Sequence, residues 1–99
     1  MKKSPLFAQA FDLHQQGHLT QARTIYQKVL KQQPHDFDAW HLLGVLEYQS
    51  HDCFSALKCI RQALTIVPTD AGALSNLGLV LAEMNQLDEA IQSFNQSLS

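Results

Sequence analysis

The chain has 99 residues, 45% of them hydrophobic, and a formal net charge of −2. This length allows one domain, and the small net charge predicts no general attraction to nucleic acid or to an anionic membrane surface. No apolar run approaches the roughly 20 residues that a membrane-spanning helix needs. The scarcity of glycine and proline favours an all-helical protein.

Residues of the same type recur at intervals of 34 positions along the chain. The recurring positions are Ala22, Ala56 and Ala90; Leu30, Leu64 and Leu98; Pro34 and Pro68; Asp36 and Asp70; Leu43 and Leu77; and Gly44 and Gly78. One period shared by several classes of residue indicates an array of similar units. We place these units at residues 3–36, 37–70 and 71–99, the last one truncated, and expect them to form one domain.

The first unit predicts two helices separated by a turn at residues 16–18. Ser4-Pro5 is a typical helix start, because Pro is favoured in the first turn. The second helix of the unit carries Ala22 and Tyr26 at helical spacing.

The second unit predicts helices over residues 38–49 and 53–67. Asp36 and Asp52 stand where side-chain N-caps are expected, and Pro68 ends the second helix because it cannot extend the hydrogen-bond ladder. Helices of this length joined by short turns form antiparallel pairs.

The third unit repeats this pattern, with Asp70 as the expected cap of its first helix. A turn at residues 84–86 precedes a final helix over residues 87–99. In that helix Ile91, Phe94 and Leu98 share the inward register, and part of this stripe is expected to lack cover.

Small residues recur where two helices of a pair would approach closely. Ala10, Gly44 and Gly78 occupy one repeat position, and a helical glycine costs about 1 kcal/mol relative to alanine. Close backbone approach offsets this cost. Large residues are expected to fill the space beside the contacts, namely Tyr26, Trp40, Ile60 and Phe94.

At these positions the chain resembles the tetratricopeptide repeat family. The second unit matches the family pattern through Trp40, Leu43, Gly44, Ala56, Ile60, Ala63 and Pro68. The third unit matches it through Leu74, Leu77, Gly78, Leu81, Ala90 and Phe94. Glu47 stands where the family has an aromatic residue, with Tyr48 one place later.

The resemblance implies a right-handed α-solenoid of antiparallel helix pairs, about three repeats long. It also implies binding of a protein or peptide in the groove lined by the first helix of each pair. The groove residues expected on this basis are Phe7, Phe11, His14, His41, Val45, Tyr48, Ser75, Asn76 and Leu79.

No lysine or arginine falls in this groove, so an anionic ligand would lack a charged partner there. The family's carboxylate clamp for C-terminal peptides is therefore expected to be absent, with Asn76 alone matching one of its positions. The aromatic and aliphatic groove residues predict an apolar or amphipathic peptide segment as the ligand. Phe7 and Phe11 have an alternative role, as packing between the first and second units.

Catalytic and metal chemistry are not expected from this sequence, and we predict a protein that is not an enzyme and has no cofactor. Gly17 interrupts the helical spacing between His14 and His18 that a metal pair would need. Cys53 and Cys59 are six residues apart on one helix, so their thiols point in different directions. Reduced thiols favour a cytoplasmic protein.

The early end of the third unit leaves two further hypotheses. The chain is a fragment of a longer array, or two copies cover each other's C-terminal faces as an assembly module. Residues 41–50 and 68–94, which include Asn76, also resemble repeats that precede bacterial O-linked N-acetylglucosamine transferase-like domains. That resemblance implies the N-terminal repeat region of a larger glycosyltransferase-like protein.

Overall fold

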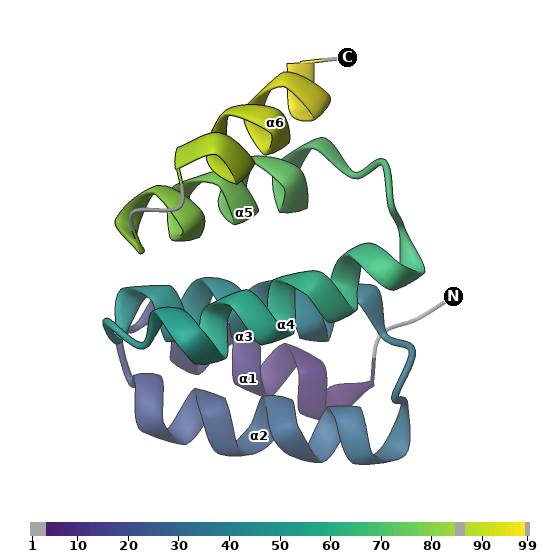
Figure 1. Ribbon diagram of the computed structural model, residues 1–99. Coiled ribbons are helices and arrows are strands. Elements are labelled where there is room, and N and C mark those ends of the chain that lie inside the picture. Colours follow the sequence, from purple (N-terminus) through teal and green to yellow (C-terminus); the bar gives the residue numbers. More distant parts are fainter. Residues whose placement is uncertain (1–3, 85–86, 99) are drawn as a thin grey trace.

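The computed structural model describes residues 4–84 and 87–98, which hold six α-helices and no strand. The helices are α1 (Pro5–Gln15), α2 (Leu19–Gln32), α3 (Phe37–Gln49), α4 (Cys53–Ile66), α5 (Ala71–Glu83) and α6 (Leu87–Leu98). They form three antiparallel pairs stacked in chain order, with α2 packed against α3 and α4 against α5 (Figure 1). The all-helical solenoid predicted from the sequence is confirmed, and it measures 38 × 28 × 19 Å.

The predicted N-caps begin the helices as expected. In each case a side-chain oxygen accepts a hydrogen bond from the backbone N–H three residues later, which satisfies a donor that the helix leaves unpaired. These pairs are Ser4 with Phe7, Asp36 with Ala39, Asp52 with Ser55, and Asp70 with Ala73. Hydrogen bonds from the backbone and hydroxyl of Ser55 lower the pKa of Asp52.

The turns within the first two pairs share one geometry. Gly17 and His51 both have positive φ, at 84° and 65°. The N–H groups of these two residues and of the residues after them reach back to the last turn of the helix, which is a Schellman ending. His51 therefore takes a left-handed conformation that glycine adopts without strain. The equivalent turn at residues 85–86 lies outside the described residues.

Small residues admit large side chains from the partner helix, as predicted. A Cβ added to Gly44 would lie 2.6 Å from Cγ1 of Ile60, and one added to Gly78 would lie 2.7 Å from the ring of Phe94. Neither position has room for a larger residue without rearrangement. Ala90, which recurs with Ala22 and Ala56 at the 34-residue period, has a side chain outside the described part of the structure.

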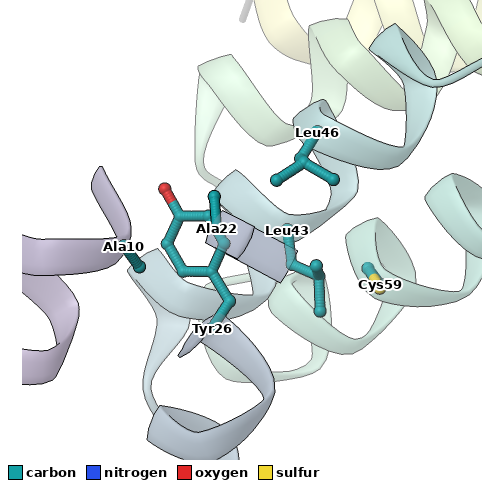
Figure 2. Packing of buried hydrophobic residues seen from close by; sticks show 6 residues of the cluster. All are labelled: Ala10, Ala22, Tyr26, Leu43, Leu46 and Cys59. Carbon is teal, nitrogen blue, oxygen red and sulfur yellow. The ribbon is translucent and has the colours of Figure 1, made fainter. Parts of the chain in front are cut away.

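Two hydrophobic clusters form the interior of the described chain. The first joins α1, α2, α3 and α4 through Ala10, Ala22, Tyr26, Leu43, Leu46 and Cys59 (Figure 2). In that view the ring of Tyr26 lies beside Ala22, while Leu43 lies toward Cys59. The second cluster joins α4 and α5 through Ala56, Ile60 and Val80. Each cluster spans a junction between pairs, so the pairs are held together by shared cores.

The apolar stripe of α6 is only partly covered, as the sequence indicated. Phe94 packs against Gly78 of α5. Ile91 is 59% exposed and Leu98 is 85% exposed. The part of this stripe that carries Ile91 and Leu98, which we call the outer side of α6, therefore presents aliphatic groups to solvent.

Candidate functional site

The first helices of the three pairs, α1, α3 and α5, are linked by two side-chain hydrogen bonds. Nε2 of His14 lies 2.7 Å from Oε1 of Gln49, and Nδ2 of Asn76 lies 2.7 Å from Nε2 of His41. Both pairs are separated by 35 positions, one more than the repeat period. These bonds align α1, α3 and α5 as one surface, which we call the first-helix face.

The first of these links continues to the interior. Because Oε1 of Gln49 can only accept, His14 donates from Nε2, and in the neutral ring its Nδ1 accepts from the hydroxyl of Tyr26 at 3.0 Å. Tyr26 is fully buried, and burial raises its pKa to about 12. His14, predicted as a groove residue, is thus also a tether between α1, α2 and α3.

The second link fixes the ring of His41. Asn76 donates its amide hydrogen to Nε2, so the neutral ring carries its proton on Nδ1. The ring of Phe37 lies 5.5 Å from that of His41, centroid to centroid. Two predicted groove residues, His41 and Asn76, are therefore brought into direct contact and held in place.

Phe7 and Phe11 take part in both surface and core. Their rings stack 6.4 Å apart and nearly parallel. Phe7 also packs edge-on against Tyr26 at 6.1 Å and against the first cluster. Both phenylalanines are half-buried. Phe7 therefore takes the packing role, whereas Phe11 contacts the ring of Phe7. A peptide-binding role for either residue stays a prediction.

A small hollow lies between α3 and α5 on the first-helix face. Four predicted groove residues line it, together with the buried side chains of Ile60 and Val80: Val45, Tyr48, Asn76 and Leu79. Its volume of about 20 Å³ is enough for a group the size of a water molecule or methyl. Leu79 is 44% exposed at its rim. The predicted residue Ser75 is half-buried on α5 and is not among the lining residues.

A larger hollow of about 380 Å³ adjoins the first through Tyr48. Its other lining residues come from the ends of α3 and α5, the turn after α3 and the start of α4: Gln49, His51, Cys53 and Glu83. Through Tyr48, the two hollows are neighbours along the junction of the second and third pairs.

Charges are sorted between the two sets of helices. The first helices α1, α3 and α5 carry Asp12, Asp38, Glu47 and Glu83 and no lysine or arginine. The second helices of the first two pairs, α2 and α4, carry five basic residues and no aspartate or glutamate. The second helix of the third pair, α6, carries Asp88 and Glu89 and no lysine or arginine. A segment bound on the first-helix face therefore meets apolar groups and no lysine or arginine of α1, α3 or α5, a setting that disfavours an anionic ligand.

The sequence did not predict an ion pair that the structure forms between Arg23 and Glu47. Glu47 is 7% exposed, and its Oε1 accepts from Nη2 of Arg23 at 2.8 Å and from Nε at 3.0 Å. Arg23 also donates to the Ser50 hydroxyl. The hydrogen bond to Glu47 raises the pKa of Arg23. An acid at a position where the repeat pattern has an aromatic residue was the available signal, although it did not identify the partner.

Within residues 4–84 and 87–98, no three His, Cys, Asp or Glu side chains are arranged to hold a metal ion. Cys53 and Cys59 are free cysteines. The described helices include none that is both long and apolar enough to cross a membrane.

Comparison with protein families gives two matches, both to models described as tetratricopeptide repeat. One covers residues 36–99 and the other covers residues 7–52. Together they span nearly the whole chain, including the first-helix face.

Curated relatives are similar over a short part of their own length. The peroxisomal targeting signal receptor of Candida glabrata is 30% identical over 87 residues, which is 88% of this chain and 15% of that protein. The corresponding receptor of Eremothecium gossypii is 36% identical over 56 residues, 57% of this chain and 10% of that protein. The auxiliary subunit NAA15 of the N-terminal acetyltransferase A complex of Arabidopsis thaliana is 35% identical over 60 residues, 61% of this chain and 7% of the subunit. The chain thus spans about a tenth of the curated relatives that it matches.

Solved structures share the fold over almost the whole chain. A structure of MamA from Desulfovibrio magneticus has a TM-score of 0.89 at 28% identity, covering 95% of this chain and 53% of that one. The second repeat domain of Spaghetti (RPAP3), bound to the HSP90 peptide SRMEEVD, has a TM-score of 0.91 at 16% identity. That match covers 94% of this chain and 86% of the RPAP3 domain.

Proposed function

The chain belongs to the tetratricopeptide repeat family, and on this basis we propose that it is a non-catalytic protein-interaction module. Its first-helix face binds an apolar or amphipathic peptide segment of a partner protein. Related proteins support peptide or protein recognition in general: a targeting signal receptor is among its relatives, and a peptide-bound domain shares its fold.

The hollow lined by Val45, Tyr48, Asn76 and Leu79 is the observation that carries this proposal. It combines aliphatic and aromatic walls with one polar side chain, which suits an apolar anchor beside a peptide bond. Its size admits the tip of one aliphatic side chain. Glu83 borders the adjoining hollow, so a basic residue next to that anchor would find a charge partner.

Binding differs from that of the peptide in the RPAP3 complex, since SRMEEVD carries acidic residues. Helices α1, α3 and α5 contain no cation to pair with such side chains or with a terminal carboxylate. We therefore propose a ligand that is apolar and neutral or basic.

Selection of peptides from a random library displayed on phage, with the full chain as bait, tests this function. Enriched peptides should contain aliphatic or aromatic anchors. Leu79→Asp should weaken their binding by at least about tenfold, because a carboxylate would replace an apolar wall. Val67→Asp places the same change on another exposed aliphatic residue, at the end of α4, and should bind normally.

Circular dichroism would verify that both variants retain wild-type helicity. Phe11→Ala and Tyr48→Ala should likewise weaken binding while the fold persists. Equal binding by Leu79→Asp and the wild type would contradict the use of this face.

A second candidate function, assembly with another copy of the chain, is favoured by the exposed Ile91 and Leu98 of α6. In this hypothesis the outer side of α6 packs against its counterpart. Light scattering over a concentration series should then show dimers that Ile91→Asp abolishes. A monomer at every concentration would contradict self-association.

The cellular location and the neighbouring domain are predictions from the sequence. A cytoplasmic location agrees with the two free cysteines, and a place before a glycosyltransferase-like domain rests on local resemblance alone.

A further inference from the structure

A third hollow, of about 370 Å³, is lined by residues of α2, α3 and α4 and shares no lining residue with the two hollows described above. We call it the α2–α4 hollow. It is lined by Gln27, Leu30 and Lys31 of α2, by Trp40, Leu43 and Glu47 of α3, and by Ser55, Lys58 and Cys59 of α4. This volume falls in the range of small-molecule sites.

Four of these side chains make an apolar lining: Leu30, Trp40, Leu43 and Cys59. Leu43 and Cys59 are buried members of the first cluster (Figure 2). The indole N–H of Trp40 donates to the carbonyl oxygen of Pro34 at 2.8 Å, which fixes the ring. Burial raises the pKa of Cys59 to about 11, so its thiol is neutral at physiological pH. The lining is therefore preformed and uncharged.

Two ammonium groups border this lining from facing helices, Lys31 from α2 and Lys58 from α4. Neither helix carries an acid. The acid in the hollow, Glu47, is compensated by Arg23 at 2.8 Å. Glu47 follows Trp40 by seven residues on α3, or about 10 Å along the helix axis. Because α2 and α3 are antiparallel, Lys31 lies at the Trp40 end, away from Glu47.

From this arrangement we propose that the α2–α4 hollow binds a small amphipathic anion, an aromatic or aliphatic acid. Its apolar body lies against Leu30, Trp40 and Leu43, and its acidic group lies between Lys31 and Lys58. This site is separate from the peptide-binding face, and either can exist without the other.

Titration of the full chain with 8-anilinonaphthalene-1-sulfonate, an aromatic anion, tests the proposal. Trp40 is the single tryptophan of the chain and lines the hollow, so a probe bound there must show energy transfer from its fluorescence. We expect saturable binding of one probe per chain. The neutral analogue N-phenyl-1-naphthylamine, which lacks the sulfonate, should bind about tenfold more weakly.

The double variant Lys31→Gln/Lys58→Gln should weaken binding of the sulfonate probe by about tenfold and leave the neutral probe unaffected. Lys28→Gln is the matched control, because Lys28 is an exposed lysine of α2 outside the lining. Both variants change exposed residues, and unchanged circular dichroism would verify their fold.

Three results would overturn the proposal: equal affinity for the two probes, an equal loss of binding in Lys28→Gln, or binding without energy transfer from Trp40. Loss of the sulfonate probe on Leu79→Asp would place the binding on the first-helix face instead. If Leu79→Asp still binds the sulfonate probe and the double lysine variant does not, the α2–α4 hollow is supported. That result would hold even if the peptide proposal were wrong.

Discussion

At the scale of single residues, Glu47 is a buried carboxylate whose charge depends on one partner, Arg23. Its carboxylate is nearly buried and accepts two hydrogen bonds from one guanidinium. Arg23 comes from the preceding pair, so the ion pair joins the first and second pairs across their boundary. Such a pair imposes geometry even where it adds little net free energy.

Arg23→Ala should lower the free energy of unfolding by about 2 kcal/mol, because it leaves a charge buried without its partner. The double variant Arg23→Met/Glu47→Leu should stay within about 1 kcal/mol of the wild type, since apolar groups need no partner. Urea denaturation of the three proteins provides the comparison. A double variant as unstable as Arg23→Ala would show that the pair itself is strongly stabilising.

At the scale of elements, the turn after α3 carries a strain that the turn after α1 lacks. Both turns need a left-handed residue, which is Gly17 in one and His51 in the other. A side chain in this conformation meets the following carbonyl group, and glycine avoids that contact.

His51→Gly should therefore raise the free energy of unfolding by about 0.5–1 kcal/mol, as measured by urea denaturation. Gly17→Ala should have the opposite effect of similar size. Destabilisation by His51→Gly would mean that the imidazole makes contacts in the adjoining hollow worth more than the strain.

The contact between α5 and α6 depends on the absence of a side chain at position 78. Gly78→Ala should destabilise the protein by about 1–3 kcal/mol through overpacking, although alanine is the better helix former by about 1 kcal/mol. Phe94→Leu in the same chain should restore part of the loss by removing the ring. Thermal unfolding followed by circular dichroism measures all three proteins. A more stable Gly78→Ala variant would indicate that the two helices have room to separate.

The elements were predictable because their signals are local. Asp36, Asp52 and Asp70 act on donors three residues away, and Pro68 lies just beyond the end of α4. The predicted start of α3 and the predicted end of α4 each differ by one residue from the observed ones, Phe37 and Ile66.

Contacts between pairs were harder to predict, because they depend on how far each pair rotates relative to the last. The hydrogen bonds of His14 with Gln49 and of His41 with Asn76 join residues 35 positions apart. The 34-residue period of the sequence therefore does not predict these pairs. The packing of Phe7 has the same origin. Its position on the helix is fixed by sequence, but its contact with Tyr26 follows from how α2 packs against α1.

At the scale of the whole molecule, the sorting of charge gives the stack two different surfaces. The surface of α1, α3 and α5 offers apolar groups and acids, whereas α2 and α4 offer five basic residues. The basic surface covers the first two pairs, because α6 of the third pair carries Asp88 and Glu89 and no lysine or arginine. Partners of opposite charge would thus be directed to opposite sides of one small protein.

The most direct test of the central claim is amide chemical-shift mapping of the full chain with the tightest peptide selected on phage. We predict that the largest shifts cluster at Val45, Tyr48, Asn76 and Leu79, with small changes along α2 and α4. Shifts concentrated on α2 and α4 or on the outer side of α6, with the first-helix face unchanged, would contradict peptide binding at this surface.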